Sequence, residues 1–247
     1  MNALIFDLDD TLYDLADPLY RALKKVYGNR IEEPGEAQFI AFRKYSDERF
    51  EESRNGAISM EEMFIYRIRK TLEEIGVQTT DEEALFFQDT YVECQRTITL
   101  TDTMKEMLSW CKKQNILTAV LSNGAVDHQM DKINALGILS YIPRHRLFFS
   151  DAMEYAKPDK RIFEQAAKTL GLENTSESPI YYIGDSFEND VSGPKKAGWK
   201  TVWYNHRNYA LPESPIPDYM VRTEAELFET VKTLAEINFQ NNKELMD

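Results

Sequence analysis

The stretch Ala3-Leu4-Ile5-Phe6-Asp7-Leu8-Asp9-Asp10-Thr11 decides the fold of this chain. Four consecutive apolar residues predict a strand that is buried on both faces, as is typical of parallel sheets, and the run stops abruptly at the carboxylate of Asp7. Five further short apolar runs recur along the chain, several of them ending at a polar or glycine-containing step. They are Leu117–Leu121, Leu147–Phe149, Ile180–Ile183, Thr201–Tyr204 and Tyr219–Val221.

Helical patterns separate these runs. Apolar residues recur at the spacing of one helix face from Met104 to Cys111 and from Phe163 to Leu170. Thr103 with Glu106, and the pair Thr223 and Glu226, match the capping box that opens a helix. Strands that alternate with helices predict right-handed crossovers and a parallel sheet covered on both faces. We therefore expect a doubly wound, Rossmann-like α/β core.

The segment 14–98 interrupts this alternation, because it has helical periodicity and few strand signals. Start signals stand at Ser59 with Glu62 and at Thr80 with Glu83. We expect a helical cap domain at 14–98 inside an α/β core domain at 1–13 and 99–240, with a C-terminal tail at 241–247. The helices expected in the cap are Pro18–Tyr27, Gly35–Glu52, Met60–Ile75 and Asp81–Gln95.

Composition and charge exclude several classes of protein. The 247 residues carry 29 lysines and arginines against 42 aspartates and glutamates, and the net charge of −13 repels a nucleic-acid backbone. No apolar run approaches the roughly 18 residues that a membrane span needs, and no signal peptide is readable. The cysteines, Cys94 and Cys111, lack metal-type spacing and are expected to be small core residues. A soluble cytoplasmic protein, a monomer or a homodimer, is the expectation.

Candidate site residues follow the predicted strands. Ligands of an open parallel sheet bind beyond the carboxyl ends of its strands. Asp7 and Asp9 stand there after the first run, Ser122 and Asn123 after the second, and Asp185 after the fourth. Two carboxylates about 4 Å apart repel by about 4 kcal/mol at an effective dielectric of about 20, so the cluster needs a cation. Oxygen ligands without histidine or thiolate favour Mg²⁺.

These residue types together suit phosphate chemistry. A divalent ion, a lysine such as Lys157, a serine at a strand end and free backbone amides bind phosphate oxygens. An aspartate can attack phosphorus and form an acyl-phosphate, which splits one difficult displacement into two easier ones. A second aspartate two residues later can protonate the leaving oxygen and then deprotonate the hydrolytic water.

The motifs resemble those of the haloacid dehalogenase (HAD) superfamily. Asp7-Leu8-Asp9-Asp10-Thr11 resembles its DxDxT first motif, Ser122 its second, Lys157 its third, and Gly184-Asp185 through Asp190 its GDxxxxD fourth. All four motifs occur in the order of the family, and the helical insert looks like its subclass I cap. The resemblance covers essentially the whole chain.

The resemblance implies a role for each matching residue. Asp7 would be the nucleophile and a Mg²⁺ ligand, and Asp185 a second metal ligand. Asp9 would be the acid and base and would bind the metal through its backbone carbonyl. Ser122, the Asn123 amide and Lys157 would bind the phosphoryl group, and Lys157 would also stabilise its charge. Asp190 would orient Lys157 or metal-bound water. Thr11 would support the loop. Asp10 and Asp14 match no required spacing and are expected to face solvent or to cap the loop.

The expected function is Mg²⁺-dependent hydrolysis of a small phosphorylated metabolite through an aspartyl-phosphate. Within the superfamily, the motif stretch and the helical cap are most similar to pyrimidine 5′-nucleotidases, so a nucleoside 5′-monophosphate is one candidate substrate. Phosphatases of sugar phosphates or phosphoglycolate, and a phosphotransferase like β-phosphoglucomutase, remain alternatives. Haloacid dehalogenases proper need no acid at the position of Asp9. Receiver-type phosphoacceptor domains are smaller and have no room for the insert.

Overall fold

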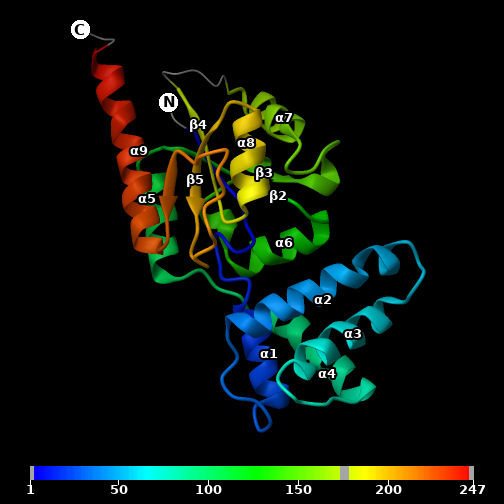
Figure 1. The fold of residues 1–247 in the computed structure, drawn as a ribbon. Helices are drawn as coiled ribbons and strands as arrows, with labels where there is room; N and C mark the ends of the chain where they lie inside the picture. Colours follow the sequence, from blue (N-terminus) through cyan, green and yellow to red (C-terminus); the bar gives the residue numbers. More distant parts are fainter. Residues whose placement is uncertain (1–2, 173–177, 245–247) are drawn as a thin grey trace. The chain divides into compact units, whose positions relative to one another are not determined.

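The computed structural model describes residues 3–172 and 178–244. Within these ranges the chain forms a six-stranded parallel sheet with the order β3-β2-β1-β4-β5-β6 (Figure 1). The strands are β1 Ala3–Phe6, β2 Leu117–Ser122, β3 Leu147–Phe149, β4 Ile180–Gly184, β5 Lys200–Tyr204 and β6 Tyr219–Val221. Each apolar run of the sequence is therefore a strand, and the predicted α/β fold is confirmed.

The helices lie on both faces of the sheet. In Figure 1, α5 and α9 lie on one side of the strands and α7 and α8 on the other. The helices are α1 Asp17–Tyr27, α2 Glu36–Arg54, α3 Met60–Glu73, α4 Asp81–Gln95, α5 Asp102–Lys113, α6 Val126–Ala135, α7 Lys160–Leu170, α8 Gly193–Lys196 and α9 Glu224–Glu244. Shorter helical turns are η1 Ile138–Ser140, η2 Arg144–Arg146, η3 Ser150–Ala152 and the π-helical η4 Phe187–Ser192.

The strand pattern explains how both faces are covered. Successive side chains of a strand point to opposite faces, so each apolar strand offers a core surface on both. Ala3 and Ile5 of β1 pack in one cluster with Phe163 of α7. Trp110 of α5 and Phe228 of α9 meet edge to face with ring centroids 6.1 Å apart. Burial of these apolar faces is what holds the helices on the sheet.

The chain divides into two compact units. Unit 1 comprises residues 1–14 and 99–247, of which the described residues form the sheet and α5 to α9, and unit 2 comprises Leu15–Ile98 with α1 to α4. Tyr27, Phe42 and Phe87 are buried in the core of unit 2. The capping boxes predicted at the starts of α3 and α4 are present, because Ser59 and Thr80 each exchange hydrogen bonds with the glutamate three residues later.

Two expectations about helix ends are wrong. The cap of α5 is Thr101, whose hydroxyl accepts a hydrogen bond from the backbone N–H of Met104, so Thr103 lies inside the helix. The segment 241–247 is not wholly a tail, because α9 continues to Glu244; residues 245–247 lie outside the described residues. The capping box of Thr223 with Glu226 is present at the start of α9.

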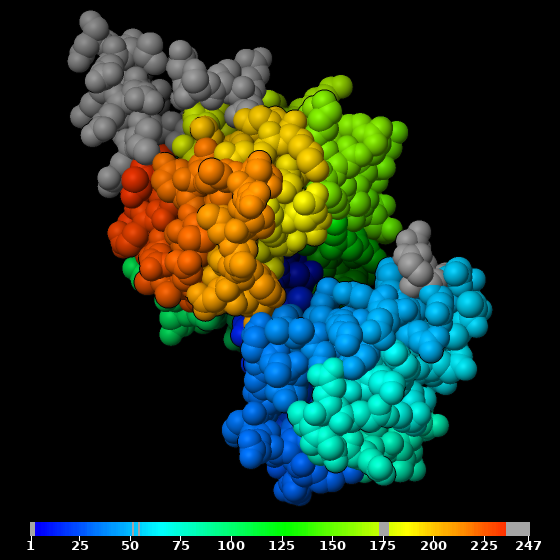
Figure 2. Space-filling view, in the orientation of Figure 1, coloured from blue at the N-terminus to red at the C-terminus, as the bar shows by residue number. Residues whose placement is uncertain are grey.

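Three further features concern exposure and burial in the described residues. Residues 208–214, between β5 and β6, are exposed (orange in Figure 2), and Leu211 and Ile216 of this connection are 51% and 68% accessible. Among residues 3–172 and 178–244, no helix is long and apolar enough to cross a membrane. Both cysteines are buried, as expected for core residues.

Candidate active site

The candidate site lies where the strand order reverses. β1 sits between β2 and β4, and the chain crosses from one half of the sheet to the other at this point. The carboxyl ends of such neighbouring strands bind ligands in open α/β sheets. Asp7 follows β1 and Asp185 follows β4, and the Asp7 N–H donates to the Ile183 carbonyl at 2.8 Å. The sheet thus brings together two residues that are far apart in sequence.

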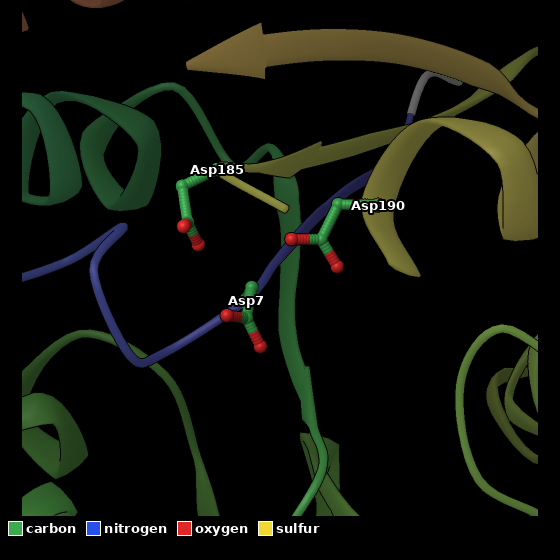
Figure 3. A group of neighbouring side chains, drawn as sticks. All are labelled: Asp7, Asp185 and Asp190. Atoms are coloured by element: carbon green, nitrogen blue, oxygen red, sulfur yellow. The ribbon is translucent and has the colours of Figure 1, made fainter. Parts of the chain in front are cut away.

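Asp7, Asp185 and Asp190 form one carboxylate group. An oxygen atom of each lies within 4.8 Å of the others, and Figure 3 shows the three side chains converging from the ends of β1 and β4 and from η4. Asp190 is fully buried, and Asp7 is 6% exposed. Asp190 comes this close because residue 184 is a glycine, since a Cβ there would lie 2.4 Å from Asp190 Oδ2. The glycine before Asp185 therefore has a steric reason.

Lys157 joins two members of this group. Its Nζ donates to Asp7 Oδ1 at 2.8 Å, to Asp190 Oδ1 at 2.6 Å and to the Tyr182 hydroxyl at 2.9 Å. The Asn123 side chain holds the Lys157 backbone, because its Nδ2 donates to the Lys157 carbonyl and its Oδ1 accepts from the Lys157 N–H, both at 2.9 Å. Although burial favours the neutral amine, Asp190 and Asp7 raise the pKa of Lys157 well above its usual range. A buried, charged ammonium is thus fixed beside Asp7.

The site has an excess of negative charge. Burial, opposed by Lys157 and assisted by the charges of Asp190 and Asp9, raises the pKa of Asp7 to about 6. Burial and then the charge of Asp190 raise the pKa of Asp185 well above its usual range. One ammonium group does not balance three carboxylates, so the site favours a further cation. A donor set of carboxylate oxygens alone fits a hard divalent ion such as Mg²⁺.

The carboxylate of Asp9 lies outside this group and has its own partners. Both of its oxygens accept from Lys132 Nζ, at 2.7 and 2.8 Å. Gln129 Nε2 donates to Asp9 Oδ2 at 3.0 Å, and the Tyr13 hydroxyl to Oδ1 at 2.5 Å. Burial opposes ionisation of Asp9. The charge of Lys132 and the hydrogen bonds from Lys132, Tyr13 and Gln129 outweigh this effect and lower the pKa of Asp9.

Ser122 and Thr11 lie near these acids. Ser122 ends β2 and is buried, and its Oγ accepts from Gln129 Nε2 at 2.9 Å. The same amide nitrogen donates to the Asn123 carbonyl at 3.0 Å. Thr11 Oγ1 donates to Asp185 Oδ1 at 3.4 Å. The structure therefore places all eight predicted site residues around one end of the sheet, and it separates the Asp9 carboxylate from the group that could hold a metal.

Asp10 was expected to face solvent or to cap the loop, and the first of these alternatives is wrong. It is 6% exposed and adopts a left-handed backbone conformation with φ 58°. Arg207 donates to both of its carboxylate oxygens, with each bond 2.5 Å long, and also to Asp14 at 2.7 Å. Despite its burial, hydrogen bonds from His206 and Arg207 lower the pKa of Asp10 to about 2. This network ties the first motif to the segment after β5.

Sequence reasoning missed several residues that contact the site, among them Tyr13, Gln129, Lys132, Tyr182 and Arg207. Residues 129, 132 and 133 of α6 and its C-cap, Leu136, form a buried stripe at helical spacing, so the polar residues at its first two positions were a readable signal. A tyrosine inside a strand buried on both faces must find a hydrogen-bond partner, which also points to Tyr182. Nothing local marks Arg207, because its partner Asp10 is 197 residues away.

Comparison with known proteins agrees with this geometry. Residues 1–198 match the sequence model of the haloacid dehalogenase-like hydrolases. The chain belongs to this family. The prediction that it is a HAD-family enzyme is thereby confirmed.

Individual HAD relatives differ in substrate. The chain is 28% identical to N-acylneuraminate-9-phosphatase of Homo sapiens, over 92% of each chain. It is 25% identical to pyrimidine 5′-nucleotidase PynA of Streptococcus pneumoniae, over 92% of this chain and 93% of the relative. Among solved structures, the magnesium-bound HAD-hydrolase YfnB from Bacillus subtilis shares the fold with a TM-score of 0.65 and 21% identity, over 93% and 98% of the two chains.

Proposed function

We propose that this HAD hydrolase is a Mg²⁺-dependent phosphomonoesterase that works through an aspartyl-phosphate on Asp7. The observation that carries the proposal is the contact of Asp7 with the buried ammonium of Lys157, inside a group of three carboxylates. Such a site binds a phosphate dianion only when cations outweigh the acids. Relatives that are phosphatases of different substrates support the reaction class.

Binding of Mg²⁺ by the site is part of this proposal. The oxygen donors and the uncompensated charge of the group fit Mg²⁺, and we assign to it Asp7, Asp185 and the backbone carbonyl of Asp9. When bound, Mg²⁺ neutralises the charge between these acids and phosphate. Asp190 is left to orient Lys157, because its Oδ1 accepts from Lys157 and its Oδ2 from the Ser186 N–H at 2.9 Å.

The chain's own residues divide the two chemical steps. A carboxylate oxygen of Asp7 attacks phosphorus; the new O–P bond makes the acyl-phosphate while the ester O–P bond breaks. Because its partners lower the pKa of Asp9, this carboxylate must first take up a proton from solvent. It gives that proton to the leaving alkoxide, and then takes one from the water that attacks the phosphoryl group and regenerates Asp7. Ser122, the Asn123 N–H and Lys157 bind the phosphoryl oxygens, and Thr11 supports the loop.

The substrate is a small phosphate monoester, and pyrimidine nucleoside 5′-monophosphates are our first candidates. The similarity to a pyrimidine 5′-nucleotidase supports them. Phe50 and Phe86 are exposed rings of unit 2, whereas Phe39, Phe42 and Phe87 are buried in its core and are not free to stack on a base. The similarity to N-acylneuraminate-9-phosphatase favours acidic sugar phosphates as the second candidate.

Two assays test this function. With Mg²⁺ the protein should release phosphate from p-nitrophenyl phosphate, and EDTA should abolish the release until Mg²⁺ is restored. Full activity in EDTA would remove the metal from the proposal. A panel of nucleoside and sugar monophosphates, compared by kcat/KM, then tests the substrate. Sugar phosphates or phosphoglycolate ahead of every nucleotide would end the nucleotidase assignment and leave the phosphatase standing.

A further inference from the structure

Two polar residues of α6 contact the site although none of the four motifs includes them. Gln129 and Lys132 are three residues apart, so they share one helix face. They are 1% and 6% exposed. The face is aimed at the site because α6 begins directly after the turn that carries Ser122 and Asn123. Residue 124 in this turn is a glycine with φ 146°, and a Cβ there would meet the Gln129 side chain at 3.1 Å.

The two residues differ in what they touch. Within the described chain, the ion pair of Lys132 is with Asp9 alone, and it engages both carboxylate oxygens. Gln129 uses one nitrogen to reach Asp9, Ser122 and the Asn123 carbonyl. Gln129 therefore links the acid to the phosphate-binding turn, whereas Lys132 acts on the acid alone.

Stability is a weak explanation for this buried ion pair. Removing a lysine and a carboxylate from water costs about as much as their attraction returns, and apolar residues of similar size often serve as well. The side chain of an aspartate beside a cation site can also rotate so that its carboxylate faces the metal. Because Lys132 holds both carboxylate oxygens, Asp9 cannot rotate toward the metal. The carboxylate instead keeps facing the backbone turn of Ser122 and Asn123, which binds the phosphoryl group.

We infer that Lys132 is a positioning residue that holds the Asp9 carboxylate for proton transfer, and that Gln129 couples this carboxylate to the Ser122-Asn123 turn. The inference rests on the proposed function, because it requires Asp9 to be the acid. The inference predicts different effects for the loss of Lys132 and the loss of Gln129. Loss of Lys132 affects proton transfer alone, whereas loss of Gln129 also disturbs phosphate binding.

The leaving group provides the test. p-Nitrophenolate departs with little help, whereas the alkoxide of β-glycerol phosphate needs a proton. Lys132→Met should lower kcat for β-glycerol phosphate about tenfold and for p-nitrophenyl phosphate less than about threefold, with KM unchanged. Lys132→Arg should recover most of the loss. Lys105→Met is the matched control, because Lys105 is an exposed lysine of α5 that pairs with Asp102.

A double variant distinguishes action through Asp9 from independent action. In the Asp9→Asn background, Lys132→Met should cause no further loss with either ester. The double variant remains usable if Lys132→Met alone does not fold, because removing both partners leaves no unpaired charge in the interior. Equal losses with the two esters, or a second loss on top of Asp9→Asn, would overturn the inference.

The remaining outcomes separate the inference from the proposed function. If wild-type protein hydrolyses neither ester, the proposed function fails. If wild-type protein is active but Asp9→Asn affects both esters equally, the assignment of the acid fails, and the inference falls with it. Gln129→Leu should lower kcat for β-glycerol phosphate and raise KM about fivefold for both esters, because it loses contacts to Asp9 and to the phosphate-binding turn. An unchanged KM would contradict the coupling assigned to Gln129.

Discussion

The two units of the chain treat buried polar groups differently. Unit 1 buries charged side chains in ion pairs around one end of its sheet: Asp7 and Asp190 pair with Lys157, Asp10 with Arg207, and Lys132 with Asp9. Among the described residues of unit 2, the buried polar side chains are Thr71 and Thr90. Each donates to a carbonyl four residues earlier in its own helix. Buried charge is expensive, so its concentration in unit 1 indicates where the chemistry takes place.

Arg67 marks the limit of this contrast. Its guanidinium lies 4.4 Å from the centroid of the Phe42 ring and 4.9 Å from that of Phe64, and burial lowers its pKa to about 10. Its guanidinium donates to two neutral acceptors, Gln88 Oε1 at 2.6 Å and Ser46 Oγ at 3.3 Å. Unit 2 thus stacks the Arg67 cation on aromatic rings, whereas the buried cations of unit 1 pair with acids.

The largest effect should come from the attacking carboxylate. Asp7→Asn should lower kcat for p-nitrophenyl phosphate at least about a thousandfold, since an amide is a poor nucleophile. Phosphate release measures this loss, and Asp102→Asn, at a fully exposed position of α5, is the control. If the Asp7 variant retains more than about a tenth of the activity, Asp7 does not attack phosphorus and the contrast between the units loses its chemical meaning.

The stability of unit 1 should depend on Asp10 and on pH. The folded-state pKa of Asp10 is about 2, below its usual value of 3.8, so its stabilisation is complete above about pH 4 and is lost as pH falls through 2. Asp10→Asn should cost about 2 kcal/mol at pH 7, and the difference from wild type should shrink toward pH 2. Denaturant unfolding in EDTA, with Asp102→Asn as control, measures it. A difference that stays constant with pH would contradict the pairing with Arg207.

The smallest effect on the chemical step should come from unit 2. Phe50→Ala and Phe86→Ala remove rings that are 52% and 62% exposed. Hydrolysis of p-nitrophenyl phosphate should stay within about tenfold, or about 1.4 kcal/mol of barrier, while the order of preference among natural esters changes. Parallel kcat/KM values on the nucleotide and sugar phosphate panel measure both. Loss of all hydrolysis in a folded variant would place catalytic groups in unit 2.

The elements of the fold were readable because their signals are local. A strand buried on both faces must be apolar throughout, so the runs before Asp7 and Asp185 were visible as strands, and the residues after them as site candidates. The cap of α5 was misread for a local reason as well. Thr101 and Thr103 are two residues apart, and Glu106 has capping-box spacing to Thr103 although Thr101 is the residue that caps the helix.

The rest of the site depends on contacts between distant parts of the chain. Asp10 was expected to face solvent or to cap the loop, because its partner Arg207 follows β5 and no neighbouring residue indicates the pair. Lys132 lies 123 residues from Asp9. An isolated lysine or aspartate in a sequence usually belongs to the surface, and only the packing of α6 and of the segment after β5 makes these residues internal.

The two ends of unit 2 are fastened to each other. Arg21 of α1 donates to the Thr97 hydroxyl and to the Cys94 carbonyl, each at 2.8 Å, so the first and last helices of the insert are joined near its exit. An insert closed in this way takes little from its host except two neighbouring attachment points. Such a module is suited to grafting: transplanted between Asp14 and Thr99 of a related core, or exchanged for a foreign insert, it should carry its own architecture with it.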